Sequence, residues 1–189
     1  VWIVLLFFGI IVLVITMLEN FIPDIYQKSI YDIDYKKLKK QGIKCLLFDL
    51  DNTLVPVNVD VPTTKVKELF AMLEKDFKVI ILSNSGHQRL IPFKEGLNVD
   101  VSASRKKPFK KKYLKIMDIY KFKYHEIAAI GDQLLTDING ANRVGITSIL
   151  INPIGDYEKF CTKINRFLEG FVYRKLKKKG ILQKGEYYE

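Results

Sequence analysis

The sequence predicts an α/β fold, with a parallel five-stranded sheet and helices on both faces. Short apolar runs alternate along the chain with segments of helical periodicity, which is the pattern of successive β-α-β units. The 189 residues, 48% of them apolar, suit one domain that builds its own core without disulfides. Polar residues follow four of the five apolar runs, at the strand ends where such sheets bind ligands.

Five apolar runs are the predicted strands. The first, residues 43–50, ends in carboxylates, and the second, residues 78–82, is closed by polar residues. The other three cover residues 99–103, 127–130 and 147–151. Because a predicted helix lies between each strand and the next, we expect the strands to run parallel.

Helical periodicity fills each interval between strands. The segment 66–73 carries apolar residues at i, i+3, i+4 and i+7, behind Thr63, which favours a helix N-cap. Pro92 is tolerated in the next helix only near its start or as a kink. The remaining predicted helices cover residues 87–95, 108–120 and 137–143.

A last helix is predicted in the C-terminal tail, where apolar residues recur at i, i+4, i+7, i+8, i+11 and i+12. These residues are Phe160, Ile164, Phe167, Leu168, Phe171 and Val172. Lysines and arginines surround them, so this helix can lie in the headgroup plane of an anionic membrane. An apolar stripe is equally typical of a helix packed on a sheet, and both interpretations stay open.

The predicted elements divide the chain into four parts: an apolar segment (1–18), an N-terminal extension (19–42), a core (43–155) and a basic C-terminal helix and tail (156–189). The apolar segment carries no charge and just reaches the length of a membrane-spanning helix. As an anchor, it would leave the lysines that follow it on the cytoplasmic side. Alternatively the protein starts at Met17, and the run before it is no part of the mature chain.

The net charge of +10 is concentrated in two blocks, which indicate an anionic partner. Residues 102–123 hold nine basic residues and one acid, and residues 159–189 hold nine basic residues and three acids. A nucleic acid, an anionic membrane and a phosphorylated substrate all fit this charge. Between Arg105 and Lys115, where this block is most basic, only Phe109 and Tyr113 could stack on bases, which disfavours nucleic acid.

Asp49 and Asp51 follow the first strand two residues apart, a spacing that turns both side chains to the same side of a regular strand. A carboxylate nucleophile can form an aspartyl-phosphate. A second carboxyl can protonate the leaving oxygen and later take a proton from water. We therefore expect Asp49 to be the nucleophile and Asp51 the general acid and base.

Carboxylates at two strand ends predict a site for a hard cation. Oxygen ligands of this kind suit Mg²⁺, which we expect Asp49 and Asp132 to hold, with Asp51 as a further ligand. Thr53 and Asp137 are expected to support the ligands from behind.

Cationic and polar groups nearby predict a cradle for a phosphoryl group. We expect Ser83, a backbone amide near Asn84, and the ammonium of Lys107 to bind the phosphoryl oxygens. Together with the carboxylates, these residues predict phosphoryl-transfer chemistry.

Four segments resemble, in order, the four motifs of the haloacid dehalogenase (HAD) superfamily: DLDNTL, ILSNS, KKP before a helix, and GDQLLTD. The resemblance implies a Rossmann-like HAD fold and the roles given above to each matching residue. A second aspartate in the first motif implies a phosphatase, because a dehalogenase has no leaving oxygen to protonate. Only 32 residues separate Asp51 from Ser83, and 24 separate Ser83 from Lys107, which leaves no room for a cap domain. An open site of this kind suits large substrates.

A closer resemblance, to the YqeG-like branch of HAD subfamily IIIA, covers nearly everything from Met17 onward. It is carried by NFIPDIYQKSIYDID, by GDQLLTDINGANRVG and by the basic tail. That branch is similar to phosphatidylglycerophosphate phosphatases, which implies a lipid phosphomonoester as substrate and a place at the cytoplasmic face of a membrane. A phosphatase of nucleic-acid ends, phosphoproteins or soluble esters, and a non-catalytic basic scaffold, are the alternatives.

Overall fold

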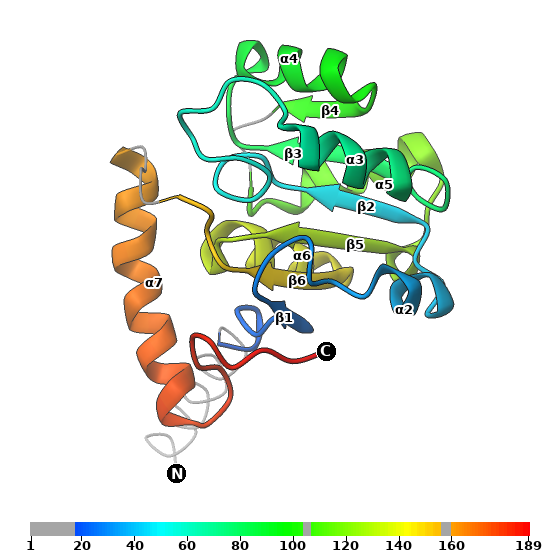
Figure 1. Ribbon diagram of the computed structural model, residues 1–189. Helices are drawn as coiled ribbons and strands as arrows, with labels where there is room; N and C mark the ends of the chain where they lie inside the picture. The colour runs from blue at the N-terminus through cyan, green and yellow to red at the C-terminus, as the bar shows by residue number, and fades with distance from the viewer. Residues whose placement is uncertain (1–17, 104–106, 156–159) are drawn as a thin grey trace.

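The computed structural model describes residues 18–103, 107–155 and 160–189, so the predicted apolar segment 1–18 lies, except for Leu18, outside the described residues. Its centre is a parallel sheet with the strand order β1-β6-β5-β2-β3-β4 (Figure 1). The strands are β1 (Ile25–Gln27), β2 (Cys45–Phe48), β3 (Lys78–Ser83), β4 (Asp100–Ala103), β5 (Ile127–Gly131) and β6 (Thr147–Ile151). The α/β class and the parallel sheet are therefore confirmed.

The sheet has six strands where the sequence predicted five. All five predicted strands are present, and the additional one is β1, which pairs with β6 through Ile25 and Ile149. Three residues are too few to show a strand periodicity, so β1 gave no signal. The other side of β1 is also occupied, because the backbone N–H and C=O of Tyr26 both pair with Tyr188 at 2.9 Å.

The helices also follow the predicted pattern. They are α2 (Tyr35–Lys40), α3 (Thr64–Leu73), α4 (His87–Leu97), α5 (Lys110–Tyr120), α6 (Asn139–Val144) and α7 (Phe160–Lys178), with a 3-10 helix η1 (Tyr124–Glu126) and a π-helical turn η2 (Leu134–Ile138). Thr63 caps α3 by accepting a hydrogen bond from the backbone N–H of Val66. Pro92 lies inside α4 instead of at its start. The short α2 was not predicted, because its lysines hide the two apolar positions that it buries.

Two apolar layers cover the two faces of the sheet. On one face α2, α3 and α4 pack on β-strand residues such as Leu46 and Ile81. On the other face α5 and α6 pack on Leu47 and Ile80. A third cluster extends this second face over β1 and β6 and takes in Leu176 of α7. Helices on both faces confirm the predicted layering, and no cap domain interrupts the described chain.

The C-terminal helix α7 lies beside the sheet and extends beyond it (Figure 1). It buries Glu169 and Leu176, whereas four of its apolar side chains are exposed. These are Ile164, Phe167, Leu168 and Phe171. These four residues of the predicted stripe therefore do not pack on the sheet, whereas Val172 packs against the third cluster. Over the described part of the chain, no helix is long and apolar enough to cross a bilayer.

Candidate active site

Three neighbouring strands bring predicted site residues to one edge of the sheet. Asp49 follows β2 in the centre, Ser83 ends β3 on one side, and Asp132 follows β5 on the other. Because the strands are parallel, their carboxyl ends meet at this edge. The juxtaposition that the sequence predicted is thus produced by the order β3-β2-β5.

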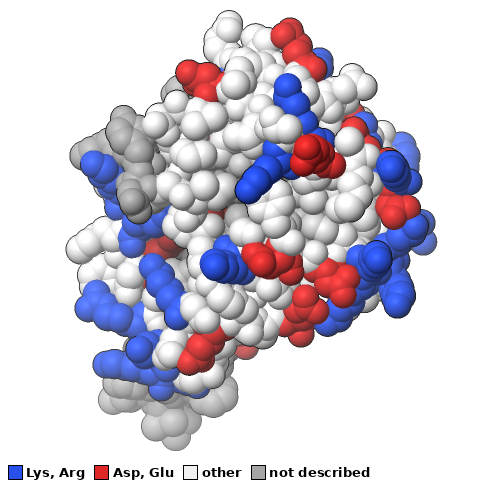
Figure 2. All heavy atoms as spheres, in the orientation of Figure 1, with Lys and Arg blue, Asp and Glu red and all other residues white. Residues whose placement is uncertain are grey.

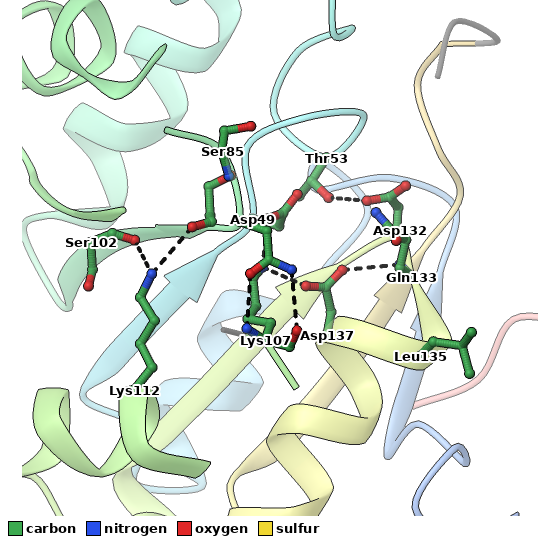
Figure 3. Close-up of polar contacts among 12 residues, drawn as sticks. Asp49, Thr53, Ser85, Ser102, Lys107, Lys112, Asp132, Gln133, Leu135 and Asp137 are labelled. Atoms are coloured by element: carbon green, nitrogen blue, oxygen red, sulfur yellow. Dashed lines mark hydrogen bonds and ion pairs between the residues drawn. The ribbon is translucent and has the colours of Figure 1, made fainter. Parts of the chain in front are cut away.

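Three buried carboxylates form the centre of the site. Asp49, Asp132 and Asp137 each offer an oxygen, and these oxygens all lie within 4.8 Å of one another. Lys107 lies against two of them, donating to Oδ1 of Asp49 and to Oδ1 of Asp137 at 2.6 Å each (Figure 3). Oxygen donors at this density are the set that a hard divalent cation takes, so the site can hold one metal ion.

A glycine allows the carboxylates to come this close. A Cβ placed on Gly131 would lie 2.4 Å from Cγ of Asp137, closer than any side chain tolerates. Asp137 lies in the turn η2. It is held close to Gly131 because its Oδ2 accepts a hydrogen bond from the backbone N–H of Gln133 at 3.2 Å. The glycine of the fourth motif is therefore required by packing against Asp137.

Burial dominates the electrostatics of the carboxylates. It raises the pKa of Asp49 to about 6, although the neighbouring Lys107 acts in the opposite direction. It also raises the pKa of Asp132 to about 8, against the effect of Arg166. Burial by itself would lower the pKa of Lys107, but the carboxylates of Asp137 and Asp49 outweigh it and raise that pKa. Lys107 is therefore a permanent cation beside Asp49.

Thr53 lies against one of the three buried carboxylates. Its Oγ1 donates to Oδ1 of Asp132 at 2.9 Å, and both side chains are buried (Figure 3). This contact ties the loop after β2 to the loop after β5, and it orients one oxygen of Asp132.

Asp51 does not join the group of three carboxylates. Its Oδ2 accepts from the Ser85 hydroxyl at 2.5 Å, and its Oδ1 accepts from Nε and Nη2 of Arg89 at 3.1 Å each. Arg89 also reaches Asp60 at 3.0 Å. These hydrogen bonds fix the direction of the Asp51 carboxylate, which lines the same pocket as Asp49. Ser85 and Arg89 were not predicted as site residues. They lie 34 and 38 residues from Asp51, and no local sequence pattern links them to it.

The phosphate-binding candidates lie at the end of β3 and in the loop before α5. Ser83 is buried, and Asn84 accepts the backbone N–H of Lys107 at 2.9 Å, which fixes the loop that carries the lysine. A further lysine, Lys112, donates to the backbone carbonyls of Ser83 at 3.3 Å and Ser102 at 2.5 Å (Figure 3). Burial and the charge of Lys107 lower the pKa of Lys112 to about 7.

The C-terminal helix contributes an unpredicted ion pair. Nη2 of Arg166 contacts Oδ2 of Asp132, and its Nη1 donates to the Asp132 carbonyl at 2.7 Å and to Glu169 at 3.0 Å. Glu169 is 1% exposed, and it also accepts the backbone N–H of Leu135 at 3.0 Å. The sequence suggested only a basic residue beside an apolar stripe, so Arg166 could not be assigned to the site.

A pocket of about 510 Å³ joins these groups. Its lining includes Asp49, Asp51, Ser83 and Lys107, together with Thr162 and Asn165 of α7. The predicted nucleophile, the predicted acid and Lys107 therefore line one pocket, and α7 forms part of its wall.

Comparison with known proteins agrees with this geometry. The family model described as mitochondrial PGP phosphatase matches residues 9–154. The chain is 37% identical to "Probable phosphatase YqeG" of Bacillus subtilis (strain 168) over 164 residues, which cover 86% of this chain and 95% of that protein.

Solved structures share the fold. An uncharacterized protein from Listeria monocytogenes serotype 4b superposes with a TM-score of 0.51 at 20% identity, over 62% of this chain and 85% of the other. A predicted HAD-like family hydrolase from Porphyromonas gingivalis gives a TM-score of 0.51 at 14% identity, over 67% of this chain and 98% of the other. The chain belongs to the mitochondrial PGP phosphatase family and is a HAD-type phosphatase.

Proposed function

We propose that this protein is a Mg²⁺-dependent phosphatase that hydrolyses a phosphomonoester through an aspartyl-phosphate on Asp49. Its preferred substrate would be phosphatidylglycerophosphate, and its product phosphatidylglycerol. The observation that carries the proposal is the buried group of Asp49, Asp132 and Asp137 with Lys107 lying against it.

In the first half-reaction, a carboxylate oxygen of Asp49 bonds to phosphorus while the bond from phosphorus to the leaving oxygen breaks. Asp51 gives its proton to that oxygen, so the lipid leaves as an alcohol. In the second half-reaction Asp51 takes a proton from water, whose oxygen bonds to phosphorus and releases Asp49 and inorganic phosphate. Arg89 and Ser85 hold Asp51 in place through both steps.

The remaining residues would neutralise the negative charge of the phosphoryl group, directly or through a metal ion. Asp49 and Asp132 would hold Mg²⁺, with Asp137 beside them, and the metal would supply a positive charge that brings the phosphate to the nucleophile. Lys107 and Ser83 would bind other phosphoryl oxygens. The donor set fits this ion, since it consists of buried carboxylate oxygens within reach of one cation.

Two features support a lipid as the substrate. The family name specifies PGP, which we take as phosphatidylglycerophosphate. In addition, no cap domain encloses the pocket within the described chain, so a headgroup can be reached while its acyl chains stay in a bilayer. We accordingly place the enzyme at the cytoplasmic face of a membrane.

The test is release of inorganic phosphate from phosphatidylglycerophosphate in mixed micelles with Mg²⁺. A panel of soluble phosphate esters and 5′-phosphorylated oligonucleotides runs alongside, and Asp49→Asn, which keeps the side-chain volume, is the blank. We expect turnover of the lipid far above the panel and none in the variant. Release from soluble esters or oligonucleotides alone would reject the lipid. Full turnover in Asp49→Asn would reject the mechanism, and no release from any substrate would favour a scaffold.

A further inference from the structure

The outer face of α7 is an exposed apolar strip. Ile164, Phe167, Leu168 and Phe171 occupy positions i, i+3, i+4 and i+7, and 45 to 68% of each residue is accessible. Side chains at these positions lie on one side of a helix. Apolar residues exposed singly are ordinary, but four that adjoin on one helix form a patch of the kind that marks an interaction site.

The opposite side of α7 packs on the rest of the protein. Arg166 and Glu169 bind the loop after β5, and Leu176 is buried in the cluster beneath β1 and β6. The helix cannot rotate its apolar strip onto the sheet without breaking these contacts. The strip is therefore presented outward by the fold.

Basic residues continue and flank the same face. Lys175 and Lys178 lie one and two turns beyond Phe171 on the line of the strip, and both are exposed. Arg174 lies over the ring of Phe171, 4.5 Å from its centroid, and Lys163 is exposed near the other end. Figure 2 shows blue side chains gathered at the lower left, the side of the molecule on which α7 stands in Figure 1.

The strip lies beside the candidate active site. Thr162 and Asn165, at the start of α7, line the pocket that holds Asp49. Asn165 also donates to the side chain of Gln133 at 3.3 Å, which fixes this end of the helix to the metal-site loop. The strip and one wall of the pocket thus belong to the same helix.

We propose that the outer face of α7 docks on the surface of an anionic lipid bilayer. The apolar side chains would enter the headgroup region, and Lys163, Arg174, Lys175 and Lys178 would meet lipid phosphates. Charge complementarity selects this occupant: a second copy would bring like charges together, and the uncharged segment 1–17 offers the lysines no anion. The inference deepens the proposed function, since docking would bring the pocket to its lipid substrate, but the docking itself does not depend on catalysis.

A fluorescent reporter on the strip tests the docking in the full-length chain. Trp2 is the protein's only tryptophan, so Trp2→Phe with Phe167→Trp leaves a single emitter on α7. With vesicles of phosphatidylglycerol and phosphatidylcholine, we expect its emission to shift to the blue and to be quenched by brominated acyl chains. With phosphatidylcholine alone we expect a smaller change. Added salt should reduce the change on the anionic vesicles, because it screens the basic residues from the lipid phosphates.

The matched control places the reporter at the other end of the sheet. Tyr124 in η1 is 57% exposed and precedes β5, so Trp2→Phe with Tyr124→Trp should stay unquenched on the same vesicles. Equal quenching at both positions, or no quenching at position 167, would overturn the proposal. A blue emission without vesicles would also overturn it, pointing to a second copy if it rises with protein concentration and to residues 1–17 if it does not.

A second variant separates docking from catalysis. Phe167→Ser removes one phenyl group from the strip and should weaken vesicle binding about tenfold or more, while Met72→Ser, exposed on α3, should not. Hydrolysis in detergent micelles should be unchanged by Phe167→Ser, and hydrolysis on vesicles should fall. If no phosphate is released from any substrate but position 167 is still quenched, the proposed function fails and the docking surface stands.

Discussion

Two cations of different origin neutralise the buried carboxylates of the site. Lys107 comes from the loop before α5 and bridges Asp49 and Asp137, whereas Arg166 comes from α7 and pairs with Asp132. A buried ion pair adds little net stability by itself, but removing one partner leaves an uncompensated charge. Each cation is therefore more important to the metal-free protein than its pairwise attraction suggests.

This balance predicts the effect of Arg166→Gln. At a pH above the raised pKa of Asp132 (about 8), loss of the guanidinium leaves a buried carboxylate unneutralised, so the free energy of unfolding in EDTA should fall by about 2–5 kcal/mol. Saturating Mg²⁺ should reduce that difference, because a bound cation neutralises the same carboxylate. Urea denaturation with and without Mg²⁺ measures both effects.

The control for this substitution lies on the same helix. Arg174 is exposed, and Arg174→Gln should change the unfolding free energy by no more than about 0.5 kcal/mol. An equal loss in the two variants would show that Arg166 contributes only ordinary surface charge.

Arg89 is predicted to act on catalysis through Asp51. Arg89→Gln removes two donors to Asp51, so the acid is no longer aimed at the leaving oxygen, and kcat on an alkyl phosphate should fall about 10–100-fold. The loss should be smaller for p-nitrophenyl phosphate, whose leaving group needs little protonation. Arg143→Gln, on the exposed side of α6, is the matched control. An equal loss on both substrates would argue against positioning of an acid.

At the scale of elements, Leu176 is the most deeply buried residue of α7 among those whose burial is described. Leu176→Ala should lower the free energy of unfolding, or of local opening of α7, by about 2–5 kcal/mol. Leu168→Ala on the exposed strip should change it by no more than about 0.5 kcal/mol. Hydrogen exchange of the α7 amides distinguishes local opening from global unfolding. Comparable effects of the two substitutions would mean that the outer face is not exposed in solution.

The elements that the sequence predicted are those with a repeating signal. Alternation of apolar runs and helical periodicities was sufficient for five strands and for α3 to α7. The strand β1 was missed because its stability comes from pairing with β6 and with Tyr188, two distant segments. Periodicity also identified the stripe of α7 without showing where it faces, because that direction is set by polar contacts of Arg166 and Glu169.

The site follows the same division. Asp49, Ser83, Lys107 and Asp132 could be proposed as site residues from the sequence because each stands at a fixed place relative to a strand or helix. Ser85, Arg89, Lys112 and Arg166 act through contacts between segments far apart in the sequence, and no local pattern records such contacts. Residues that hold a site in position are thus harder to predict than residues that face the substrate.

For the whole molecule, the buried carboxylates make folding and metal binding depend on pH. Burial raises the pKa of Asp49 to about 6 and of Asp132 to about 8, whereas an aspartate in the unfolded chain titrates near 4. Between these values the folded protein binds more protons than the unfolded chain. The contribution of the two groups to stability is therefore present at low pH and is lost as the pH rises through about 6 and about 8.

Urea denaturation in EDTA at about pH 5 and about pH 8 tests this coupling. The free energy of unfolding should decrease toward the higher pH, and Asp132→Asn, which cannot titrate, should decrease less. Mg²⁺ should stabilise the wild-type protein more at the higher pH, because it binds the carboxylates only after they lose their protons. A slope that is the same in Asp132→Asn and in the wild type, or stabilisation by Mg²⁺ that is equal at both pH values, would contradict the buried, protonated state of Asp132. Other groups titrate over the same range, so the quantity to compare is the difference in pH dependence between the wild type and Asp132→Asn. That difference measures how much the burial of one side chain changes the stability of the whole fold.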